Sequence, residues 1–104
     1  KMEVTMEIKI QAIHFDATDK LQAFIEKKTA KLEKTYEDIQ AVEVVCKVVK
    51  PATAQNKEVS ITVNVPGNRV FVEKVSDTFE EATDLCVDSL KVQLQKIKEK
   101  MRNR

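Results

Sequence analysis

Residues 57–75, KEVSITVNVPGNRVFVEKV, decide the fold of this chain. The segment 57–65 alternates between apolar and polar side chains, which is the period of a β-strand with one buried face. Its apolar positions are Val59, Ile61, Val63 and Val65, and its polar positions are Glu58, Ser60, Thr62 and Asn64. Pro66-Gly67-Asn68 predicts a turn, so residues 69–75 should return as the next strand. We therefore predict an antiparallel β-hairpin.

A helix is predicted directly after this hairpin. Thr78 followed by Glu81 has the spacing of a capping box, in which both side chains accept hydrogen bonds from amide groups at the start of a helix. From there, apolar residues keep a helical period nearly to the C-terminus: Phe79, Ala82, Cys86, Leu90, Leu94, Ile97 and Met101. The pattern predicts one long helix with a single buried face.

Before the hairpin, the sequence indicates a strand, a helix and a second strand. Residues 3–13 alternate strictly and predict a strand with one solvated face. Thr18 is predicted to be the N-cap of a helix from about 19 to 37. The apolar face of that helix consists of Leu21, Ile25, Leu32 and Tyr36. The β-branched stretch 41–49 predicts a more buried strand, and residues 50–56 a loop.

The predicted element order is therefore β-α-β-β-β-α, which defines an α+β fold. Two strands joined through a helix favour parallel pairing, whereas hairpins pair antiparallel. We predict a four-stranded mixed sheet in which the first two strands are parallel and the rest antiparallel, with two helices on one face and solvent on the other. A chain of 104 residues is expected to form one domain, residues 1–104.

The composition excludes several classes of function. A single glycine rules out a glycine-rich phosphate loop, and Cys46, Cys86 and the lone His14 lie too far apart in sequence for a zinc or redox motif. We expect no catalytic centre, metal, cofactor or small-molecule substrate, with His14 at the surface and both cysteines buried in a reducing cytosol. Neither a membrane span nor a secretory signal is visible, so a cytoplasmic protein is expected.

Lysines gather on one side of the first predicted helix. At 100° per residue, the stripe opposite the apolar face consists of Lys20, Lys27, Lys31 and Lys34. Lys28 points close to the apolar face, so its stem is expected to pack while its ammonium group reaches solvent. In the C-terminal helix, one flank of the core face carries Lys91, Lys98 and Arg102, and the other carries Lys96 and Lys100.

Two interpretations of these lysines are open at this point. Helices lying side by side would present a joint basic surface, which suits the phosphate backbone of a nucleic acid. Alternatively, the lysines belong to an ordinary solvated face, because Glu26 and Glu33 lie among them and can form ion pairs along the helix. The net charge of +1 by itself favours no partner.

Residues 18–36, TDKLQAFIEKKTAKLEKTY, resemble the first helix of the ribosome hibernation promoting factor family, also called ribosome-associated inhibitor or sigma-54 modulation proteins. The residues that match the family pattern are Lys27, Lys28, Lys31, Leu32, Glu33, Lys34 and Tyr36. The resemblance continues through VNVPGNRVFVE (63–73) to LKVQLQKIKEK (90–100), in the same element order. It covers nearly the whole chain and is closest to the short form of the family.

The resemblance implies a cytoplasmic factor that binds the small ribosomal subunit, occupies the channel for messenger RNA and transfer RNA, and inhibits translation without catalysing a reaction. It implies contacts with 16S-type ribosomal RNA and a monomer when free. Carried over by position, Lys27, Lys28, Lys31, Lys34, Lys96, Lys98 and Lys100 would face RNA. Together with the residues placed by helical period, the candidate RNA-binding set is Lys20, Lys27, Lys28, Lys31, Lys34, Lys91, Lys96, Lys98, Lys100 and Arg102.

The chain departs from the family pattern in its C-terminal helix. Thr78, Phe79 and Glu80 stand where family members usually have Asp, then Met or Leu, then Tyr. Ser89 and Val92 replace residues that are often basic, which thins the basic face that the resemblance implies for this helix.

Two other functions stay open. Leu85 and Val92 lie roughly 150° from the centre of the C-terminal helix's core face. They are either exposed residues of a protein-interaction module, suited to a partner or a homodimer, or they pack against the neighbouring helix. A generic double-stranded RNA-binding domain also places helices beside a small sheet.

Overall fold

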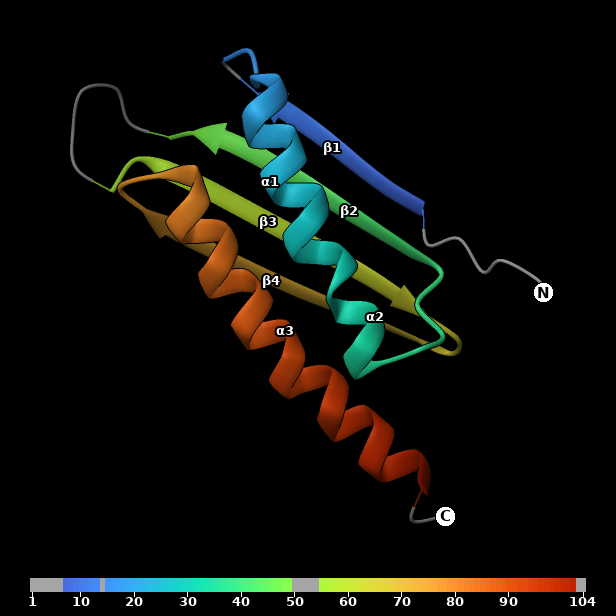
Figure 1. Cartoon of the computed structure of the whole chain (residues 1–104). Coiled ribbons are helices and arrows are strands. Elements are labelled where there is room, and N and C mark those ends of the chain that lie inside the picture. The colour runs from blue at the N-terminus through green and yellow to red at the C-terminus, as the bar shows by residue number, and fades with distance from the viewer. Residues whose placement is uncertain (1–6, 14, 50–54, 103–104) are drawn as a thin grey trace.

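The fold of the chain is given by a computed structural model that describes residues 7–13, 15–49 and 55–102 (Figure 1). Residues 101 and 102 are described by their backbone only. The elements are β1 (Glu7–Ile13), α1 (Asp19–Ala30), α2 (Leu32–Thr35), β2 (Ala41–Val48), β3 (Lys57–Val65), β4 (Asn68–Ser76) and α3 (Phe79–Arg102).

The four strands form one sheet in the order β1-β2-β3-β4. β1 pairs parallel with β2, whereas the β2–β3 and β3–β4 pairs are antiparallel. The helices α1, α2 and α3 all lie on one face of this sheet, and α1 and α3 run side by side in the same general direction (Figure 1). The predicted fold class, strand pairing and helix placement are therefore confirmed.

The core lies between the helices and the sheet face that they cover. Every second residue of β3 points into it, and Val59, Ile61 and Val63 are fully buried. The helices supply fully buried partners, namely Ile25 in α1, Leu32 in α2, and Cys86, Leu90 and Leu94 in α3. β1 is less buried than β2, as predicted, because its only strand neighbour is β2.

Both predicted helix starts are present, with one change. Thr18 Oγ1 accepts a hydrogen bond from the Leu21 amide at 3.1 Å, and Thr78 Oγ1 accepts one from the Glu81 amide at 3.0 Å. The Glu81 carboxylate, however, accepts a hydrogen bond from the Ser76 hydroxyl at 2.6 Å. The second half of the predicted capping box is thus replaced by a bond that ties the start of α3 to the end of β4.

The prediction of one continuous helix from 19 to 37 is wrong. The helix is interrupted at Lys31, whose amide donates to the Lys28 carbonyl, three residues back. Just before this point, the buried Thr29 hydroxyl donates to the Ile25 carbonyl at 2.8 Å and approaches the Glu26 carbonyl at 3.3 Å. A threonine that bonds back to the preceding turn can bend a helix. The buried Thr83 hydroxyl makes the same bond to the Phe79 carbonyl at 2.7 Å in α3, which stays continuous, so the bond at Thr29 does not by itself account for the interruption.

The hairpin turn explains the position of the only glycine of the chain. Pro66 and Gly67 connect β3 to β4, and Gly67 has φ +75°, a conformation that residues with a Cβ adopt only at a cost. Proline followed by a residue at positive φ is the signature of a type II turn. The turn fixes the register in which Val65 pairs with Asn68.

Several predictions lie outside the described residues. These are the first part of the predicted strand 3–13, the surface position of His14, most of the loop 50–56, and the side chains of Met101 and Arg102.

Candidate nucleic-acid interface

An ion pair joins α1 and α3 along the line where the two helices pack together, which we call the seam. Lys28 Nζ lies 3.0 Å from Asp84 Oδ1, and it also lies 5.5 Å from the centroid of the Phe24 ring. The side chains of Lys28 and Asp84 are 31% and 48% exposed. The expected packing of the Lys28 stem against the apolar face agrees with this half-buried position. Its positive charge, in contrast to those of the other candidate lysines, is already partnered.

A second contact joins α2 to α3 farther along. Lys98 Nζ donates a hydrogen bond to the Thr35 carbonyl at the end of α2, at 3.4 Å. Because residues seven apart share a flank of a helix, Asp84 and Lys98 identify the flank of α3 that faces α1 and α2. Lys91 lies midway between them on that flank, and it is exposed. These contacts place Lys98, and by helical period Lys91, on the flank of α3 that faces α1 and α2.

The lysine stripe of the first helical segment is solvent-exposed along its whole length. Lys20, Lys27 and Lys31 are exposed on α1 or at its end, and Lys34 is exposed on α2. Within the part of the chain that the structure describes, the one ion pair is Lys28–Asp84, so Glu26 and Glu33 do not neutralise these lysines. The exposed lysines fit both an RNA-binding surface and an ordinary solvated face.

The other flank of α3 bears Lys96 and Lys100, which are both exposed. They lie on the C-terminal portion of α3, which extends beyond the sheet (Figure 1). A shallow hollow of about 410 Å³ there is lined by Lys96, Ile97, Glu99 and Lys100. These two lysines therefore do not share the seam with Lys91 and Lys98, although they belong to the same projecting end of the molecule.

The candidate set thus divides into several groups. Lys20, Lys27, Lys31 and Lys34 form the exposed stripe of α1 and α2; Lys91 and Lys98 lie on the flank of α3 that faces these helices; Lys96 and Lys100 form a separate flank; and Lys28 is held by Asp84. The partnership with Asp84 was not predicted, because nothing in the local sequence shows which residue of another helix lies beside Lys28. Arg102 ends α3, and its side chain lies outside the described residues.

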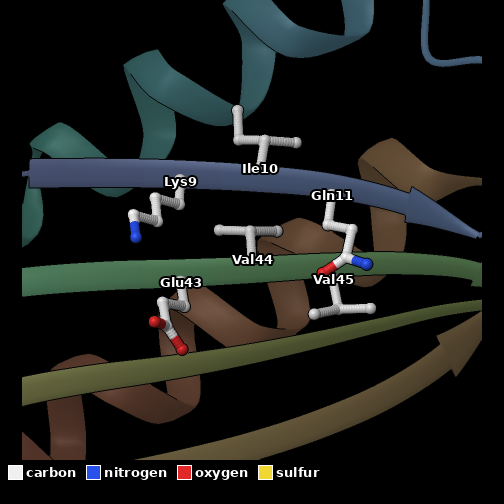
Figure 2. A pocket seen from close by; sticks show the side chains of 6 residues that line it. All are labelled: Lys9, Ile10, Gln11, Glu43, Val44 and Val45. Atoms are coloured by element: carbon white, nitrogen blue, oxygen red, sulfur yellow. The ribbon is translucent and has the colours of Figure 1, made fainter.

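The opposite face of the sheet has a different character. Its side chains form rows across the four strands, for example Lys9, Glu43, Thr62 and Phe71. A hollow of about 590 Å³ over β1 and β2 is lined by Lys9, Ile10, Gln11, Glu43, Val44 and Val45 (Figure 2). Lys9 and Glu43 have opposite charges, so this hollow is not a basic site.

The cysteines and acidic residues provide no reactive centre in the described part of the chain. Burial raises the pKa of the Cys46 thiol to about 11 and that of Cys86 to about 12, and Cys86 Sγ donates to the Val59 carbonyl at 3.2 Å. No group of three or more His, Cys, Asp or Glu side chains suited to a metal ion occurs among the described residues. None of the described helices is long and apolar enough to cross a membrane.

The sequence of the chain matches a known protein family over almost all of the described residues. The family described as Sigma 54 modulation protein / S30EA ribosomal protein matches residues 8–102. The chain belongs to this family. The family resemblance predicted from the sequence is thereby confirmed, and so is the prediction of a binding protein without enzymatic activity.

Relatives in the Sigma 54 modulation protein / S30EA family cover nearly the full chain. A ribosome hibernation promoting factor of Pseudomonas putida is 30% identical over 98 residues, which are 94% of this chain and 92% of that protein. One of Azotobacter vinelandii is 32% identical over 95 residues, which are 91% of this chain and 85% of that protein.

Two solved structures share the fold. The N-terminal domain of Protein Y from Thermus thermophilus has a TM-score of 0.77 at 29% identity, covering 88% of this chain and 99% of that one. A ribosomal subunit interface protein from Coxiella burnetii has a TM-score of 0.79 at 24% identity, covering 90% of this chain and 99% of that one. The second likeness supports the fold alone.

Proposed function

We propose that this protein is a cytoplasmic ribosome hibernation factor whose single domain binds the small ribosomal subunit, occupies the channel for messenger RNA and transfer RNA, and thereby inhibits translation. The names of the relatives support the hibernation role. The contact surface follows from the exposed lysines of α1, α2 and α3.

The observation that carries the proposal is the absence of ion pairs at these lysines within the described residues, apart from Lys28. An ammonium group without a carboxylate partner can approach a phosphate and release its counterions, with no internal pair to break. Lys27, Lys31 and Lys34 meet this condition on α1 and α2, and Lys91 meets it on α3. Because the elements pack side by side, one RNA surface can contact all of them.

Sedimentation with purified small ribosomal subunits tests the surface. The double variant Lys31→Gln/Lys34→Gln should bind more weakly than wild type. Its plot of log affinity against log salt should be shallower by about 0.7 to 0.9 for each phosphate that the variant no longer neutralises. If the double variant bound with wild-type affinity at every salt concentration, the lysine stripe of α1 and α2 would not be part of the interface.

A matched control is available on the opposite sheet face. Lys9→Gln/Lys47→Gln lowers the net charge by the same two units but changes residues of β1 and β2. This variant should bind subunits as wild type does. Equal losses in both double variants would mean that overall charge, and not a defined surface, governs binding.

Channel occupancy is tested by competition. Subunits preloaded with messenger RNA and transfer RNA should retain less of the protein than empty subunits, and added protein should lower synthesis in a reconstituted translation assay. Equal retention on loaded and empty subunits would place the binding site elsewhere on the subunit.

A second candidate function rests on α3. Leu85 and Val92 are 43% and 53% exposed, so the alternative that they pack against the neighbouring helix is wrong. Exposed apolar residues seven apart on one helix suit a protein-interaction surface. Light scattering of Leu85→Gln/Val92→Gln tests this candidate, since a mass lower than that of wild type would reveal a protein contact.

A further inference from the structure

Phe71 is the most exposed large apolar side chain of the described residues, at 56%. It lies in the middle of β4, on the sheet face that the helices do not cover. Its neighbours along the strand, Val70 and Val72, are buried in the core. Phe71 therefore contributes to neither the core nor the seam of the helices, and its aromatic ring is presented to solvent by a rigid strand.

The neighbours of Phe71 on this face leave its ring uncovered. Thr62 is its cross-strand partner on β3, and Ser60 and Asn64 are the diagonal neighbours. All three side chains are short, and each carries a hydroxyl or amide group that can donate and accept hydrogen bonds. β4 is an edge strand, so no other described strand covers the far side of the ring.

Arg69 is a positively charged residue on the same face of β4 as Phe71. Arg69 lies two residues before Phe71 and so projects from the same face, and it is exposed. Its Nε donates a hydrogen bond to Asn64 Oδ1 at 3.3 Å, which orients the side chain along the sheet. The guanidinium keeps further N–H groups that can bind a phosphate.

This face also carries acidic residues, one of them next to Phe71 along β4. Glu73 follows Phe71 by two residues, and its hydrogen bond and charge, together with burial, raise the pKa of Glu58. Glu58 lies opposite Val75, farther from the turn than Phe71. Arg69 and Glu73 flank Phe71 at the same spacing along β4, so the ring lies between one positive and one negative side chain, with Arg69 on the side nearer the turn.

We propose that Phe71 and Arg69 form a binding site for one unpaired nucleotide of an RNA strand. The base stacks on the Phe71 ring, its polar edge reaches the hydroxyl and amide groups of Thr62 and Asn64, and an adjoining phosphate contacts Arg69. Aromatic residues on an open sheet face bind splayed bases in this manner. A base inside a duplex has no free face, so the site selects single strands. The inference extends the proposed ribosomal function, on which its biological setting rests, to a second RNA contact on the side of the molecule opposite the lysines.

The test uses the absence of tryptophan from this chain. In Phe71→Trp, the new indole is the only tryptophan and reports stacking directly by fluorescence quenching. Single-stranded adenosine and uridine pentanucleotides should quench it, whereas a blunt RNA duplex at equal phosphate concentration should not. Val75→Trp is the matched control, because it places a tryptophan at another exposed apolar position of β4, opposite Glu58 and away from the lysine surface. Its fluorescence should be unchanged by the pentanucleotides.

Binding of labelled pentanucleotide separates this site from the lysine surface. Phe71→Leu should bind about 5- to 150-fold more weakly than wild type, which corresponds to the usual loss of one stacked base, while Phe71→Tyr should keep near wild-type affinity. When Phe71→Trp is combined with Lys31→Gln/Lys34→Gln, quenching should persist even where subunit binding is lost. Failure of subunit binding therefore does not remove the nucleotide site.

Three results would overturn the inference. These are unchanged fluorescence of Phe71→Trp with saturating pentanucleotide, equal quenching by duplex RNA, and wild-type affinity of Phe71→Leu. In each of these cases the lysine surface and the proposed ribosomal function would stand unaffected.

Discussion

Lys28 on α1 and Asp84 on α3 are joined by an ion pair of 3.0 Å, although 56 residues separate them in sequence. The pair lies where α1 packs beside α3. It therefore links two properties of the molecule, the packing of its helices and the amount of positive charge that it offers to an anion.

Replacement of this carboxylate should affect binding more than stability. In Asp84→Asn, Lys28 gains freedom to contact phosphate, and an acidic charge leaves the lysine surface. We expect tighter binding to small subunits and a steeper salt dependence, with a change in unfolding free energy below about 1 kcal/mol, because the pair is partly exposed. Sedimentation and urea denaturation measure the two effects, and weaker binding by this variant would contradict the proposed orientation of the interface.

The hairpin turn offers a test of backbone strain alone. In Gly67→Ala, the added methyl group has no atom within 4 Å, so the packing around the turn stays the same. The positive φ of +75° still disfavours a residue with a Cβ, and we expect the free energy of unfolding to fall by about 1 to 2 kcal/mol. Chemical denaturation gives this value. An unchanged free energy would show that the turn adopts another conformation in the variant.

Glu58 should make the stability depend on pH. Burial, and then the hydrogen bond and charge of Glu73, raise the pKa of Glu58 above 4.5, the ordinary pKa of a glutamate side chain. The folded state thus holds this proton more tightly than the unfolded state, so stability falls as pH rises from about 4.5 through the raised pKa. Glu58→Gln should remove this fall and stabilise the protein at pH 7 by roughly 0.2 to 1 kcal/mol, as expected for like charges on neighbouring strands. The melting temperatures of wild type and Glu58→Gln, measured from pH 4 to 8, check this prediction. Parallel plots of melting temperature against pH for the two proteins would contradict it.

The thiols should be inert in the folded protein. Cys46 and Cys86 are fully buried, and their pKa values of about 11 and about 12 leave little thiolate at pH 8. We expect modification by a disulfide reagent to be limited by unfolding and to become fast in denaturant. Rapid labelling of either thiol under native conditions would show that α3 opens from the sheet.

Most of the fold could be predicted from periodicity. The strand pattern in 57–65 and the turn at Pro66-Gly67 are local signals, and the structure reproduces them. The helix break at Lys31 was missed because a helical wheel assumes a constant 100° per residue. The fully buried Thr29 side chain bonds back to the Ile25 carbonyl just before the break, a contact that a helical wheel does not represent.

The candidate site was predictable only in part. Helical period shows which lysines share a flank, but the partner of Lys28 depends on how two helices pack. Phe71 could have been singled out, since alternation along β4 places it with Arg69 and Glu73 on the side away from the core. An apolar residue at a polar position of a strand is a signal that the sequence did carry.

The sheet order also has a consequence for biosynthesis. β1 is made before β2, yet among the described strands it pairs with β2 alone, and β2 follows after α1 and α2. The fully buried Leu90 and Leu94 belong to α3, the last element of the chain, so the core cannot close before α3 has emerged. The complete core of this protein therefore forms only after α3, the last of the described elements, has been made.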